Sequence, residues 1–83
     1  MDKPTPNPAK DNLAVTFSLS SETNVRLSIF DMTGKEIYVL SEAIYSGKVH
    51  NLSFNIDNIP SGTYNIVINA NGNVVSQPFT VVK

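Results

Sequence analysis

The chain has 83 residues and a formal net charge of −1, with 41% hydrophobic residues, 16% charged residues, no cysteine, no tryptophan and one histidine. A chain of this length forms one small domain and buries only about 63% of the surface that its unfolded form exposes. Its thin core leaves little room for an enzyme's rigid cleft, and the lack of cysteine excludes disulfides and thiol chemistry. Its six Lys and Arg residues are spread along the chain, which argues against nucleic-acid binding.

The amino-terminal part of the sequence contains neither a signal peptide nor an apolar run long enough to span a membrane. We therefore expect either a cytosolic protein or a piece of a longer chain. Residues 1–12 hold three of the five prolines and no large apolar residue after Met1. Because proline fixes φ and favours extended geometry, we predict a proline-rich tether over residues 1–12 and a folded domain over residues 13–83.

From residue 13 onwards, apolar and polar residues alternate with a period of two, which predicts short β-strands and no helix. The alternating segments are residues 13–19, 25–29, 36–40, 50–56, 64–68 and 74–82. Polar residues with glycine separate them, and Asn71-Gly72 is the strongest hairpin signal. We expect residues 41–48 to form a longer connection that is anchored by Ile44 and Tyr45.

The last segment contains Pro78, which lacks a backbone N–H. Pro78 therefore predicts that this segment is either an edge strand or divided into two short strands. Six or seven short strands with turns between them predict an antiparallel β-sandwich, which we favour over a barrel because the chain is short.

Candidate catalytic and ligand-binding residues are few. His50 is the only conventional base, and it shares the alternation of Leu52 and Phe54, which predicts a partly buried structural role. The acidic residues lie in or beside turns and are too scattered for a calcium loop, although a weak cation site stays open. Without tryptophan the chain also lacks the usual sugar-binding platform. We predict no catalytic residue, metal or cofactor, and hence a recognition module.

Several segments, in this order and spacing, resemble the type A C-terminal sorting domain of type IX secretion cargo. They are Pro6-Asn7-Pro8-Ala9, the strand Val25 to Asp31 leading to Gly34-Lys35, Ile59 to Tyr64, and the closing Phe79 to Lys83. The resemblance covers Thr5 to Lys83. It implies an immunoglobulin-like antiparallel β-sandwich of six to seven strands that acts as a secretion signal and not as an enzyme.

In this family the domain ends secreted Bacteroidetes proteins. The resemblance therefore implies that the chain is covalently part of a larger cargo protein, in the periplasm in transit and then at the cell surface or secreted. The implied partners are the outer-membrane translocon, its shuttle components, and a cysteine-type sortase that removes the domain and attaches the cargo to the surface.

The resemblance also implies a set of residues for recognition by the secretion machinery. They are Pro6, Asn7, Pro8, Gly34, Lys35, Gly47, Pro60, Gly62, Tyr64, Val81, Val82 and Lys83. For the glycines and Tyr64, maintenance of the fold is the competing interpretation, whereas an exposed last strand is suited to docking by β-augmentation. Because the edge of the last strand is exposed, self-association of two copies of the domain through this edge also stays open. The alternative function is a fibronectin-like or carbohydrate-binding stalk module of an extracellular enzyme or adhesin.

Overall fold

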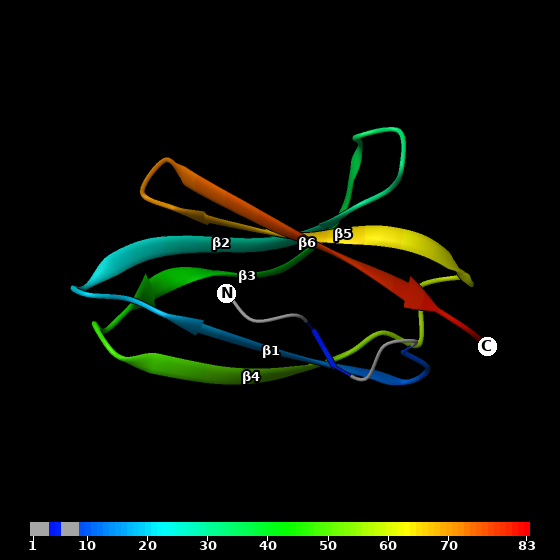
Figure 1. Cartoon of the computed structure of the whole chain (residues 1–83), viewed down its shortest axis with the longest axis horizontal. Coiled ribbons are helices and arrows are strands. Elements are labelled where there is room, and N and C mark those ends of the chain that lie inside the picture. Colours follow the sequence, from blue (N-terminus) through cyan, green and yellow to red (C-terminus); the bar gives the residue numbers. More distant parts are fainter. Residues whose placement is uncertain (1–3, 6–8) are drawn as a thin grey trace.

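Six antiparallel β-strands form two sheets that face each other (Figure 1). The computed structural model describes residues 4–5 and 9–83. The strands are β1 (Asn12–Ser18), β2 (Thr23–Phe30), β3 (Glu36–Tyr45), β4 (Val49–Asn55), β5 (Gly62–Ala70) and β6 (Asn73–Val81). Within these described residues, no helix is long and apolar enough to cross a membrane.

The larger sheet has the strand order β3-β2-β5-β6, and the smaller sheet pairs β1 with β4. The side chains between the two sheets form a core with the alternation that the sequence predicts. The buried core residues on the strands are Leu13, Val15, Phe17, Val25, Leu27, Ile29, Tyr64, Ile66, Ile68, Phe79 and Val81. The predicted all-β antiparallel sandwich is confirmed.

The predicted hairpin at Asn71-Gly72 joins β5 to β6. Asn71 has φ 53° and Gly72 has φ 91°, which are the positive values that a two-residue hairpin turn requires. In the β2–β3 hairpin, one carboxylate oxygen of Asp31 accepts hydrogen bonds from the backbone N–H of Thr33 and of Lys35 and from the Thr33 hydroxyl. These bonds lower the pKa of Asp31; the Thr33 hydroxyl has the largest effect, and the Lys35 backbone N–H has the next largest. Local side-chain hydrogen bonds thus shape this loop.

The prediction for residues 41–48 was wrong in part, because β3 continues through Tyr45. The β2–β3 register shifts twice, and these bulges let a long strand bend without ending. The predicted anchor Ile44 is 68% exposed, because it pairs with Asn24 on the face that points away from the core. Tyr45 is an anchor as predicted, since its ring packs edge-on against Phe17 at 5.5 Å.

Pro78 lies within β6, which borders only β5 and is an edge of the larger sheet. The predicted edge position is confirmed. The strand is continuous through Pro78, so the alternative of two short strands is excluded.

An ion-pair cluster lies on the outer face of the larger sheet. The Arg26 guanidinium contacts the Glu36 carboxylate at 2.5 Å and the Glu42 carboxylate at 2.6 Å. Its hydrogen bond lowers the pKa of Glu36, and both carboxylates raise the pKa of Arg26. These partners are ten and sixteen residues away in the sequence, and the β2–β3 pairing brings them together.

The first prediction concerns acid stability. Because folding lowers the pKa of Glu36, its stabilising effect is present above the ordinary glutamate pKa of about 4.3 and is lost as the pH falls through the folded value. We expect Glu36→Gln to reduce the loss of stability between about pH 5 and pH 2, as measured by urea unfolding at each pH. Glu22→Gln makes the same charge change at an exposed loop position and serves as the control. An unchanged pH dependence in Glu36→Gln contradicts the prediction.

Candidate functional site

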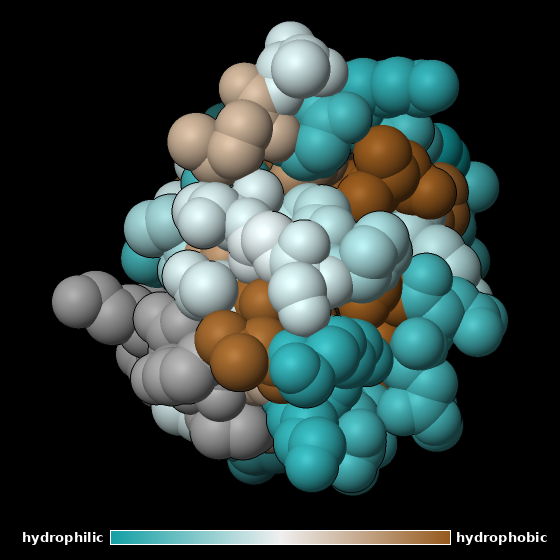
Figure 2. Space-filling model, turned by 90° about the vertical axis from the view of Figure 1, so that its right-hand side faces the viewer, coloured by the Kyte–Doolittle hydropathy of each residue, from teal (hydrophilic) through white to brown (hydrophobic). Residues whose placement is uncertain are grey.

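Half of the residues predicted for recognition meet at one end of the sandwich. This closing end comprises the lead-in residues 9–11, the β4–β5 loop of residues 56–61, the start of β5 and residues 80–83, and it faces the viewer in Figure 2. The predicted residues found here are Pro60, Gly62, Tyr64, Val81, Val82 and Lys83. Gly62 and Val81 are direct partners in the β5–β6 pairing.

The lead-in segment is part of the folded structure at Ala9. The Ala9 N–H donates to the carbonyl of Thr80 at 2.7 Å, and the Ala9 carbonyl accepts from the Val82 N–H at 2.9 Å. Ala9 is 1% exposed, so its methyl group belongs to the core. The Asp11 carbonyl accepts from the N–H of Ile56 at 2.8 Å. Backbone bonds therefore tie the lead-in to both the last strand and the β4–β5 loop.

Further towards the amino terminus, Thr5 exchanges two backbone hydrogen bonds with Ala14 of β1. The start of the described chain thus pairs with the smaller sheet, whereas Ala9 pairs with the larger one. The predicted recognition residues Pro6, Asn7 and Pro8 lie outside the described residues.

Lys83 joins several segments of the closing end through hydrogen bonds. Its ammonium group donates to the carbonyl of Lys10 at 2.8 Å and to the carbonyl of Ile56 at 3.1 Å. Its backbone N–H donates to the Ser61 hydroxyl oxygen at 3.0 Å. One cationic side chain therefore links the lead-in to the β4–β5 loop, and charge-assisted bonds of this kind are stronger than neutral ones.

Tyr64 shapes the β4–β5 loop from inside. It is 8% exposed, its ring lies beside Phe79, and its hydroxyl donates to the Pro60 carbonyl at 2.6 Å. A Cβ on Gly62 would lie 3.3 Å from that hydroxyl, so a side chain there would crowd it. The bond back to a residue four positions upstream resembles the tyrosine corner of immunoglobulin-like domains. The buried side chain of Tyr64 builds the loop, and the exposed Val82 and Lys83 are accessible to a partner.

The other predicted residues lie elsewhere. Gly34 and Lys35 belong to the β2–β3 hairpin, which extends away from the two sheets in Figure 1. Gly47 lies in the β3–β4 loop, at the opposite end from the closing end (Figure 1). A Cβ there would lie 2.7 Å from Cα of Ser21, so glycine permits close packing with the β1–β2 loop. The nine predicted residues that the structure describes therefore do not form one patch.

The candidate base His50 packs against other side chains. His50 is partly buried as predicted, stacks on Phe17 at 5.3 Å, and donates from Nε2 to the Ser46 carbonyl at 2.8 Å. Over the residues that the structure describes, no cluster of three or more acidic or histidine side chains is placed to hold a metal. These contacts give His50 a packing role.

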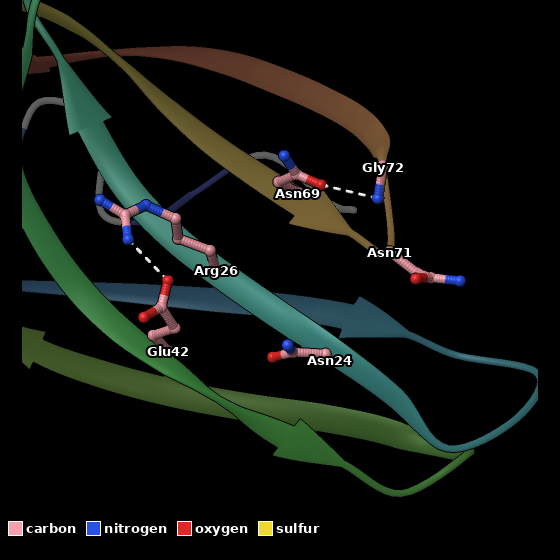
Figure 3. A pocket seen from close by; sticks show the side chains of 6 residues that line it. All are labelled: Asn24, Arg26, Glu42, Asn69, Asn71 and Gly72. Carbon is pink, nitrogen blue, oxygen red and sulfur yellow. Dashed lines mark hydrogen bonds and ion pairs between the residues drawn. The ribbon is translucent and has the colours of Figure 1, made fainter.

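A shallow depression lies on the outer face of the larger sheet. Its side chains are polar, and Figure 3 shows three that bind within the protein: Arg26 faces Glu42, and Asn69 accepts from the N–H of Gly72 at 2.9 Å. Arg26, Glu42 and Asn69 are therefore held by partners within the larger sheet and its hairpins.

Sequence reasoning missed three residues of the closing end, namely Ala9 and Asp11 in the lead-in and Ser61, whose hydroxyl accepts from the N–H of Lys83. Ala9 and Asp11 act through backbone groups, which every residue type has, so their identity carries no signal for these contacts. The small apolar side chain of Ala9 in a polar, proline-rich segment was the only clue to its burial.

The second prediction tests the role of Tyr64. We expect Tyr64→Ala to lower the free energy of unfolding by about 3 kcal/mol, because it removes a buried ring. Tyr64→Phe keeps the ring, removes the hydroxyl bond to Pro60, and should cost about 1 kcal/mol. Urea unfolding measures both. Tyr38→Ala removes a ring that is 41% exposed and should have the smallest effect of the three. Equal losses at Tyr38 and Tyr64 would rule out this role.

Comparison with known proteins identifies the family. A family model described as the secretion system C-terminal sorting domain matches residues 5–82. A search of curated proteins found no match. The matched range includes both residues 9–11 and the last strand, which the structure places together at the closing end. The chain belongs to the family of type IX secretion system C-terminal sorting domains.

Proposed function

We propose that the outer-membrane type IX translocon recognises this domain at its closing end, and that the domain then presents the chain upstream of it to a cysteine-type sortase. Family membership makes the domain a type IX sorting signal and part of a larger cargo that is exported to the cell surface or secreted. The observation that carries the proposal is the pairing of Ala9 with Thr80 and Val82. It places the upstream connection beside the last residues.

The surface of the closing end suits recognition. Val82 is 52% exposed, and Lys83 is exposed beside it. Figure 2 shows hydrophobic residues among hydrophilic ones at this end. A partner that docks here gains both apolar contact and a positive charge, and it lies next to the segment that leads to the cargo.

We propose the remaining steps on the basis of family membership. The cargo reaches the periplasm through its own signal and is passed by shuttle components to the translocon of a Bacteroidetes outer membrane. The sortase then cuts upstream of the domain and joins the cargo to the surface. In this proposal the sandwich supplies a rigid recognition surface and does not take part in the chemistry, in keeping with a family that serves as a signal.

The third prediction is an export experiment in a type IX host. A reporter behind a signal peptide is fused to the complete chain, to the chain without residues 73–83, or to a variant with Val82→Ala and Lys83→Ala. We expect surface reporter with the complete chain, and a loss of at least tenfold with the other two. Equal surface export by all three would defeat the proposal.

A matched control separates recognition from folding. Lys48→Ala with Val49→Ala also removes a lysine and an exposed valine, but at the opposite end of the sandwich. We expect this variant to be exported like the complete chain. Urea unfolding of both double variants shows whether each remains folded, so a loss of export in a folded Val82/Lys83 variant is a loss of recognition.

A further inference from the structure

The free edge of β6 offers hydrogen-bonding groups at only a few positions near the closing end. In a strand without a bulge, backbone groups of alternate residues face the same side. The Thr80 carbonyl and the Val82 N–H bind Ala9, so they face away from β5, and the backbone of Pro78 faces the same way. Pro78 has no N–H to donate. A strand that adds here must therefore use Thr80 and Val82.

Those two groups already bind the chain's own lead-in. Ala9 takes the acceptor of Thr80 and the donor of Val82, in a parallel bridge opposite Val81. The lead-in is thus a short strand-like segment in the position that an added strand of a partner would need. The two cannot occupy this edge together, because each backbone group points to one neighbour.

The lead-in is held by few contacts at its exposed positions. Lys10 and Asp11 are exposed on the surface, and the Lys10 carbonyl is bound by the ammonium group of Lys83. Segments with few buried apolar contacts open at a lower free energy than the core. Lys83 therefore adds a charge-assisted bond at Lys10 to the three backbone bonds of Ala9 and Asp11 that keep residues 9–11 in place.

We propose that residues 9–11 and 80–83 form a clasp, and that an extended peptide segment of a partner opens it by pairing with Thr80 and Val82 in place of Ala9. Opening exposes the peptide bond between Lys10 and Asp11 and releases the upstream connection. Recognition of the last residues is thereby coupled to access at the junction with the cargo. The clasp rests on the proposed function for its place in secretion.

Limited digestion of the purified chain with trypsin measures the opening. Trypsin cuts after lysine but not before proline, so Lys3-Pro4 is resistant and Lys10-Asp11 reports on the clasp. We expect Lys83→Met to speed cleavage there by roughly tenfold, because it removes a charge-assisted bond. Cleavage at Lys48-Val49, at the opposite end, should keep its rate. Lys35→Met makes an equal charge change in the β2–β3 hairpin and should alter neither of these two cleavage rates.

A locked variant provides the second measurement. Ala9→Cys with Val81→Cys, in the Lys83→Met background, joins the two bridged positions in a chain that has no other cysteine. We expect the oxidised form to be cleaved at Lys10-Asp11 as slowly as the original chain. We expect the reduced form to be cleaved as fast as Lys83→Met. Fast cleavage in the oxidised form, or a parallel rise at Lys48-Val49 in Lys83→Met, overturns the clasp.

A separate peptide, added to the digestion, tests whether an extended segment can pair with Thr80 and Val82 in place of Ala9. The probe copies residues 4–12 with Lys10→Gln so that trypsin leaves it intact. In excess over Lys83→Met, it should speed cleavage at Lys10-Asp11 severalfold, whereas the same peptide with Ala9→Pro lacks the N–H for Thr80 and should not. Equal effects of the two peptides overturn the proposed strand pairing. No secretion machinery is present in these assays, so their failure is distinct from a failure of the export experiment.

Discussion

The double pairing of β2 is the constraint on which the rest of the structure depends. β2 lies between β3 and β5, and its side chains Val25, Leu27 and Ile29 are completely buried under the smaller sheet. A domain of this size without disulfides has one thin core, so a one-residue slip of β2 would turn these three side chains towards water. The same register places Arg26 on the outer face between two carboxylates.

Both edges of the larger sheet are protected against pairing with other molecules. β3 is interrupted by two register shifts, which bend the edge, and β6 carries Pro78 and the bound lead-in. Natural sheets use bulges, prolines and covering segments for this purpose. Protection of this kind suits a domain that belongs to a cargo protein and must stay unaggregated during export.

The closing end connects the β4–β5 loop, the last residues and the lead-in through hydrogen bonds. Tyr64 fixes the β4–β5 loop from within, and this loop presents Ser61 and the Ile56 carbonyl to Lys83. Lys83 in turn holds the lead-in. Lys83 and residues 9–11 thus share one surface, so the recognition that we propose at the last strand would act directly beside the segment that leads to the cargo.

The sequence by itself determined the alternating strands and the Asn71-Gly72 hairpin, and it limited Pro78 to an edge strand or a break between two short strands, because alternation, turn conformation and a missing N–H are local properties. Only the tertiary structure decided the length of β3 and the burial of Ala9, together with the contacts of Lys83. Bulges alter the strand phase through pairing with a neighbour, and backbone bonds between distant segments do not depend on residue type. Such contacts exist only once the sheets have assembled.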